Sequence, residues 1–182
     1  VMMLLCEYDQ KVYAASLRID PNRAQLFEYE SVTFYCEGVS YCEVVCESKV
    51  KLSSCNKTNK RTLTGSSCTI TNIYTDDSGK YWLDAGGGNE SNSVNIVVTN
   101  GSVILEIPAL PVMEGEAVTL TCRNKTTSSQ TSADFYKDGV FIYSSSTGNM
   151  IIRSVSMSNE GLYKCSISGA GESAESRLTV RV

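Results

Sequence analysis

Cysteine is the residue type in this chain with the most chemistry open to it. The 182 residues include eight cysteines and no histidine. A zinc site would therefore need thiolates alone, yet no two cysteines stand in the paired Cys-x-x-Cys spacing typical of such sites. Disulfide formation in an oxidising compartment is the expected chemistry. The eight residues are Cys6, Cys36, Cys42, Cys46, Cys55, Cys68, Cys122 and Cys165.

Catalysis is not expected of this chain. General acid–base chemistry most often uses histidine. Asp76 and Asp77 are adjacent carboxylates, but neighbouring residues on a strand point to opposite faces. The glycine-rich stretch AGGGNES, residues 85–91, has no helix after it to complete a phosphate cradle. We therefore expect no enzymatic activity, no metal and no cofactor.

The charge balance also excludes a class of partner. The formal net charge is −4 and the pI is about 4.9, whereas nucleic-acid binders usually carry a basic face. The densest basic patch, Lys57, Lys60 and Arg61, is typical of a solvated loop. Nucleic acid is not an expected partner.

Four Asn-x-Ser/Thr sequons favour an extracellular location. Each sequon is weak evidence alone, but together with the cysteines they indicate a secreted, glycosylated surface. The expected glycosylation sites are Asn56, Asn89, Asn100 and Asn124.

The N-terminal stretch, residues 1–14, has its own signature. It begins with the apolar VMMLLC and ends near Val12 and Ala14, a small-x-small pattern typical of signal-peptide cleavage. We interpret it as a signal-peptide remnant, with an apolar first strand as the alternative. No other apolar run reaches the roughly 18 residues of a membrane helix. The sequence predicts an extracellular chain, at the cell surface or secreted, whose membrane attachment would come from a segment absent here.

An internal repeat predicts the architecture. ESVTFYC, residues 30–36, recurs as EAVTLTC, residues 116–122, and SGKYWL, residues 78–83, recurs as EGLYKC, residues 160–165. Inside each motif apolar and polar residues alternate, as in a half-buried strand. Short strand-like runs separated by turn signals such as KDG fill the rest. We predict an all-β protein of two tandem immunoglobulin-like β-sandwiches, residues 15–99 and 100–182, joined with almost no linker as a bent, semi-rigid pair.

The repeat also ranks the disulfides. Cys122 and Cys165 fit the bridge that crosses the two sheets of such a sandwich between strands B and F. In the first repeat Leu83 stands where the second cysteine would be, so a buried Cys36 thiol packed against Leu83 is one expectation. The predicted pairs, in order of preference, are Cys122–Cys165, Cys55–Cys68 and Cys36–Cys42. Cys46 is left over and, if exposed, would support a dimer.

Several stretches resemble a known family. GSVILEIPALPVMEGEAVTLTC, with ADFYKDG and EGLYKCSISGAGES, resembles the second extracellular domain of Fc receptors and Fc-receptor-like proteins. SLRIDPNRAQLFEYESVTFYC, with GSSCTITNIYTDDSGKYW, resembles their first domain. The fish leukocyte immune-type receptors are the most similar branch. The resemblance implies the extracellular ligand-binding region of a leukocyte receptor whose ligand is a protein, either immunoglobulin or an MHC-like molecule.

The resemblance also implies where a ligand would bind. In mammalian Fc receptors two tryptophans of the second domain clamp a proline of the antibody. Here Ser102 and Lys125 stand at those positions, so this clamp is absent, and a glycan on Asn124 would crowd the same face. The remaining candidates are an edge strand and the F–G turn. With Lys125, these candidate residues are Phe141, Tyr143, Gly169, Ala170, Gly171 and Glu172.

Two alternatives stay open at this stage. Phe141 and Tyr143 are equally consistent with local packing, since single exposed apolar residues are ordinary. Cell adhesion or self-association through the same domains is the alternative function.

Overall fold

The computed structural model describes residues 15–38, 43–48, 52–54, 59–62, 65–84, 90–126 and 131–182. The expected signal-peptide remnant, residues 1–14, lies outside the described residues, as do Cys42, Cys55, Asn56 and Asn89. The predictions made for them stay predictions.

The first domain is built from two sheets that face each other. One sheet has the order β1 (Ser16–Asp20), β3 (Val32–Glu37), β7 (Gly65–Ile70), β6 (Asn59–Thr62). The other has the order β2 (Gln25–Phe27), β9 (Glu90–Thr99), β8 (Gly79–Asp84), β4 (Val44–Ser48), β5 (Leu52–Ser54). A single turn of 3-10 helix, Thr75–Asp77, precedes β8.

The second domain repeats this plan. One sheet has the order β10 (Val103–Glu106), β12 (Val118–Asn124), β15 (Asn149–Ile152). The other has the order β14 (Val140–Ser145), β13 (Ala133–Lys137), β16 (Gly161–Ile167), β17 (Gly171–Glu172), with β18 (Ser176–Leu178) also on β16. A short parallel pair, β11 (Val112–Met113) and β19 (Val180–Arg181), and a 3-10 turn, Met157–Asn159, complete it. The predicted all-β architecture is confirmed.

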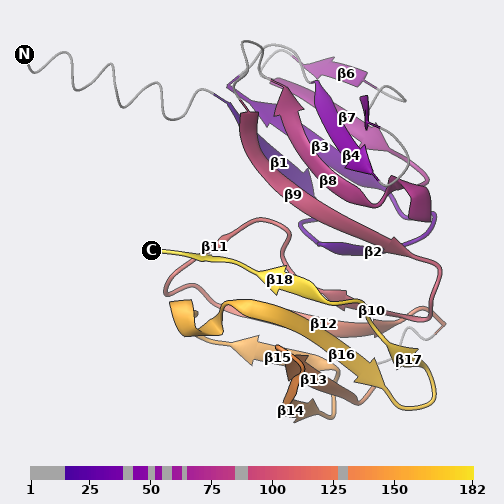
Figure 1. Ribbon diagram of the computed structural model, residues 1–182, viewed down its shortest axis with the longest axis vertical. Coiled ribbons are helices and arrows are strands. Elements are labelled where there is room, and N and C mark those ends of the chain that lie inside the picture. Colours follow the sequence, from indigo (N-terminus) through magenta and orange to yellow (C-terminus); the bar gives the residue numbers. More distant parts are fainter. Residues whose placement is uncertain are drawn as a thin grey trace, which may run out of the picture.

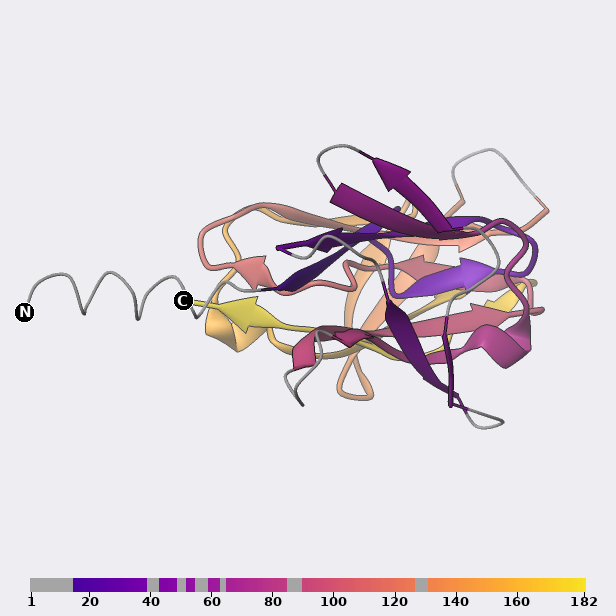
Figure 2. The ribbon, with the colours of Figure 1, turned by 90° about the horizontal axis from the view of Figure 1, so that it is seen from above.

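The two domains are stacked rather than placed end to end (Figures 1 and 2). Strand β9 of the first domain runs without a gap in the chain almost to β10 of the second, through residues 100–102. Strand β2 and strand β10 lie at the contact between them. The chain therefore turns back at the joint between β9 and β10.

The strand registers show that the repeat is structural. Leu17 lies opposite Cys36 in the first domain, as Leu105 lies opposite Cys122 in the second. On the facing sheets, Val44 lies opposite Leu83 as Phe135 lies opposite Cys165. Leu83 thus occupies the place of Cys165, and it is buried in the same core as Cys36.

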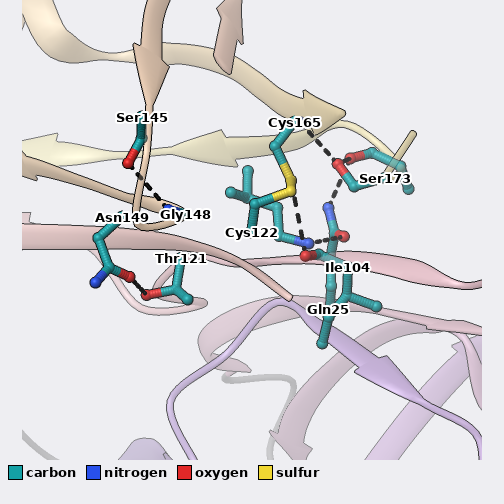
Figure 3. Close-up of a disulfide and its surroundings, with 11 residues drawn as sticks. Gln25, Ile104, Thr121, Cys122, Ser145, Gly148, Asn149, Cys165 and Ser173 are labelled. Atoms are coloured by element: carbon teal, nitrogen blue, oxygen red, sulfur yellow. Dashed lines mark hydrogen bonds between the residues drawn. A yellow bond between two sulfur atoms is a disulfide. The ribbon is translucent and has the colours of Figure 1, made fainter. Parts of the chain in front are cut away.

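The cysteines follow the predictions in part. Cys122 and Cys165 form a disulfide with their Cα atoms 5.9 Å apart (Figure 3). Cys36 is itself disulfide-bonded, so the expectation of a free thiol packed against Leu83 is wrong. Cys68 is disulfide-bonded too. Because the predicted partners Cys42 and Cys55 lie outside the described residues, both pairings stay predictions.

Cys46 is free, as predicted, but it is not a dimerisation site. It is only 6 % exposed and lies on β4 directly opposite Tyr81. Burial raises the pKa of the Cys46 thiol, although a hydrogen bond with Tyr81 opposes the effect. An inward-facing position in the strand pattern, shared with Val44, accounts for this burial.

Each domain has a buried tyrosine, on β8 or β16, that ties the turn before that strand to the core. The hydroxyl groups of Tyr81 and Tyr163 donate to the carbonyl oxygens of Asp77 and Asn159, each at 2.5 Å. Burial raises the pKa of both phenols, and nearby carboxylates raise it further. The folded chain therefore holds these groups in their neutral form.

These shifts predict a loss of stability at alkaline pH. A group whose pKa is raised by folding contributes stability below its unfolded pKa, and that stability is lost as the pH rises above it. The ordinary values are 9.0 for cysteine and 10.0 for tyrosine. We expect a thermal midpoint that is level from about pH 7 to pH 9 and falls above it. Thermal unfolding measured at a series of pH values from 7 upward checks this expectation. The thermal midpoint of Tyr163→Phe should fall less steeply with pH than that of the parent chain. An equal fall in both would contradict the role given to Tyr163.

Candidate functional site

A row of side chains crosses the outward face of the second domain. Tyr136 on β13 lies opposite Phe141 on β14 and opposite Lys164 on β16. The rings of Tyr136 and Phe141 are 6.0 Å apart, and Nζ of Lys164 is 5.3 Å from the centre of the Tyr136 ring. Lys164 also pairs with Glu172 at 3.3 Å. We call Phe141, Tyr136, Lys164 and Glu172 the aromatic row.

The aromatic row joins two residues that the sequence predicted with two that it missed. Phe141 and Glu172 were candidates, while Tyr136 and Lys164 were not. Strand alternation was a usable signal, because Phe135 and Cys165 point inward and their neighbours must point outward. The row presents an aromatic end at the sheet edge and a charged end beside β17.

A β-bulge separates the two aromatic residues of the edge strand. The register between β13 and β14 shifts between Phe135 and Tyr136, so Tyr143 lies opposite Phe135 while Phe141 lies opposite Tyr136. Adjacent residues of β13 point to opposite faces, so their partners do too. Phe141 therefore joins the outward face, whereas Tyr143 lies 6.4 Å from the buried ring of Phe135. The structure does not bring the predicted pair into one patch.

Tyr143 instead lines a pocket at the open side of the sandwich. This pocket, of about 690 Å³, lies between β14 and β15. Its apolar lining includes Ile142, Met150 and Ile151, and Arg153 adds a charge. No pattern in the sequence predicts this pocket, because it depends on how the edges of two sheets are spaced.

Strand β14 is an open edge of its sheet. Four consecutive apolar residues, Val140 to Tyr143, are exposed, and Phe141 is 54 % exposed. Charged residues and prolines usually keep edge strands from pairing with other chains. The strand VFIYSS has neither. This edge can therefore accept a partner by packing and by backbone hydrogen bonds.

The other predicted binding residues lie at the opposite end of the domain from Val140. Lys125 is exposed and its N–H donates to the carbonyl oxygen of Ser102 at 2.8 Å. The F–G turn, residues 168–170, closes through a hydrogen bond from the Ala170 N–H to the Ile167 carbonyl at 3.0 Å. Both turns lie at the end of the domain where β12 ends and β10 begins. Phe141 lies closer to the other end, because its neighbour Val140 pairs with Lys137.

The two described sequons differ in their surroundings. Asn100 is exposed in the turn after β9. Asn124 is half-buried, and its Oδ1 accepts the N–H and the hydroxyl of Thr126, both at 3.1 Å. Both remain predicted glycosylation sites.

The described residues also bear on metal binding and on membrane insertion. Within the described ranges, no three side chains among histidine, cysteine, aspartate and glutamate gather where they could hold a metal ion. In the same part of the chain, no helix has both the length and the apolar character needed to span a membrane.

Comparison with known proteins finds an immunoglobulin domain in the second half of the chain and similarity to Fc receptor-like proteins over more of it. The family model of the immunoglobulin domain matches residues 102–182. Human Fc receptor-like B is 32 % identical over 89 residues, which are 48 % of this chain and 21 % of that protein. Human Fc receptor-like protein 4 is 24 % identical over 162 residues, 88 % of this chain and 30 % of that protein. Mouse Fc receptor-like protein 5 is 26 % identical over 148 residues, which are 81 % of this chain and 24 % of that protein.

The chain thus spans less than a third of the length of each of these relatives. Two solved structures also match. The second Ig-C2 domain of human Fc-receptor like A covers 44 % of this chain and 98 % of its own length, at 22 % identity and a TM-score of 0.37. The match to murine CEACAM1b covers 92 % of this chain and 100 % of that one, at 17 % identity and a TM-score of 0.37. At these TM-scores neither structure informs function. The relatives named are human and mouse proteins, so the likeness to the fish branch stays a prediction.

Proposed function

We propose that this chain is the extracellular ligand-binding region of an Fc-receptor-like leukocyte receptor, because residues 102–182 match the immunoglobulin-domain model and the chain is similar to Fc receptor-like proteins. Its ligand is a protein, either immunoglobulin or an MHC-like molecule. The chain acts at the cell surface or in secreted form, by binding and not by catalysis.

The aromatic row is the observation that supports this proposal. Aromatic residues dominate the binding energy of protein interfaces when they lie at the centre of a contact. Phe141 is exposed at an open edge, and Tyr136 lies beside it with a cation over its ring. The ion pair of Lys164 and Glu172 forms a polar border. An aromatic centre with a charged border is the composition expected of a protein-binding surface.

Binding to a panel of immunoglobulins and MHC-like proteins tests the proposal. Phe141→Ala should weaken binding of the recognised ligand by about tenfold or more, the effect expected of an aromatic anchor. Ile151→Ala is the matched control, because Ile151 is equally exposed at 56 % but lies on β15 of the other sheet. Surface plasmon resonance with immobilised ligand measures both. Equal losses in the two variants, or no binding to any panel member, would count against the proposal.

Self-association is the second candidate, favoured by the uncharged edge of β14. Two copies would pair antiparallel through this strand and extend the sheet. Sedimentation should then show a dimer at micromolar concentration that Ile142→Lys abolishes, since a lysine on the edge is unfavourable for pairing. A monomer at every concentration would remove this candidate.

A further inference from the structure

Gln25 connects the first sandwich to the second through a buried side chain. Its side-chain nitrogen donates to the Ala174 carbonyl at 2.8 Å and to Oγ of Ser176 at 2.9 Å. Its Oε1 accepts the Leu105 N–H at 2.9 Å. Gln25 is 1 % exposed, and Figure 3 shows its side chain extending from the first domain toward the disulfide of the second. Three hydrogen bonds of a buried amide would be lost if the domains moved apart.

The apolar cores of the two domains meet at the same place. Ala24 belongs to the first domain but packs in the core of the second, and its N–H donates to the Ile107 carbonyl at 2.8 Å. In return, Leu110 packs against the core of the first domain, and Ala109 packs against both. Oδ1 of Asn22 accepts the N–H groups of Ala109 and Leu110 at 2.9 and 3.1 Å. Each core is completed by residues of the other domain.

Four charged residues of alternating sign border this contact. Arg23 and Glu30 come from the first domain, and Glu106 and Arg123 from the second. Arg123 lies 2.9 Å from Glu30, and Arg23 lies 3.0 Å from Glu106. Nε of Arg123 is 3.1 Å from Glu106 but is poorly aligned for a hydrogen bond, so this contact is an ion pair only. The Arg123 guanidinium also lies 5.0 Å from the centre of the Phe27 ring. Partly exposed ion pairs stabilise weakly, so they add specificity to the contact more than strength.

From these contacts we infer that the joint couples the two sandwiches into one cooperative folding unit, with Gln25 as the residue that connects them. When the second sandwich unfolds, the Gln25 amide loses its three partners and Ala24 loses its packing. Water then replaces those partners, but the apolar surface of the first core that Ala109 and Leu110 had covered is exposed, so the first sandwich is destabilised as well. The pair then behaves as a rigid body, and the inference does not depend on which ligand it binds.

The chain contains its own reporter for this coupling. Trp82, on β8 of the first domain, is the only tryptophan in the sequence, so its fluorescence follows the first domain alone. Met150→Ala removes a buried side chain from β15, the strand farthest from β10 in its sheet. If the domains are coupled, this variant lowers the Trp82 thermal midpoint by about 5 °C or more, and circular dichroism gives the same midpoint. If Met150→Ala does not fold, Ile152→Val on the same strand applies the test with a smaller shift.

Gln25→Ala tests whether Gln25 is required for the coupling between the two domains. In a Gln25→Ala background, Met150→Ala should leave the Trp82 midpoint unchanged, and the dichroism curve should separate from the fluorescence curve. Asn95→Ala is the matched control, because Asn95 is an exposed amide of the same sheet that makes none of these contacts across the joint. A Trp82 midpoint that does not respond to Met150→Ala in the parent chain overturns the coupling. One that still responds in Gln25→Ala overturns the role of Gln25.

Discussion

Replacing both Cys122 and Cys165 by alanine should lower the free energy of unfolding by about 4 kcal/mol. The two residues are 43 positions apart, and the chain-entropy model gives this value for a closed loop of that length. The bridge joins β12 to β16, the central strands of the two facing sheets, and both cysteines are buried. Urea unfolding followed by circular dichroism measures the loss, with the slope compared to confirm that the same transition is seen.

Cys46, a free cysteine of the first domain, supplies the control for this change. Cys46→Ala removes a buried sulfur without opening a loop, so it should cost about 1 kcal/mol from lost packing. The difference between the two variants isolates the cross-link. If the double variant lost no more stability than Cys46→Ala, packing alone would hold the two sheets together and the entropic account would fail for this domain.

The core of each domain could be predicted from the sequence because it depends on local alternation. Val32, Phe34 and Cys36 are buried, and so are the repeated positions Val118, Leu120 and Cys122. Two-residue periodicity fixes which side chains point inward once a strand is recognised. The KDG turn can also be predicted from the sequence, because Asp-Gly favours a hairpin turn with two positive φ values. Asp138 and Gly139 both have positive φ in the structure.

The candidate site was predicted less well, for a physical reason. The bulge opposite Phe135 depends on the pairing of two strands, and the alternation inside either strand does not reveal it. A regular strand would place Phe141 and Tyr143, two positions apart, on the same face. The joint was also missed in detail, since Gln25 contacts residues 80, 149 and 151 positions away along the chain. A lone glutamine between apolar residues carries no signal of three such partners.

Gly148→Ala should lower the free energy of unfolding by about 3 kcal/mol. Gly148 has φ +86°, a conformation that costs an ordinary residue about 1–2 kcal/mol. An added Cβ would also lie 2.7 Å from the carbonyl oxygen of Thr131 and 3.3 Å from that of Cys122. Both atoms belong to the backbone and cannot turn aside, and overpacking of this kind typically costs a further 1–3 kcal/mol or so. The Gly148 carbonyl accepts the Cys122 N–H at 2.8 Å, so displacement would reach the strand that carries the disulfide.

Gly139→Ala separates the two contributions to this loss. Gly139 has a similar φ of +80°, but a Cβ there would meet nothing within 4 Å. It should therefore cost only the conformational part, about 1 kcal/mol. Thermal and urea unfolding of the two variants, in the same domain and under the same conditions, gives the difference directly. The Ser145 hydroxyl accepts the Gly148 N–H at 3.0 Å and closes this turn (Figure 3). The difference of about 2 kcal/mol between the two variants measures how closely the turn packs against β12. Equal losses in the two variants would show that the Thr131 carbonyl moves freely and that no close packing constrains this turn.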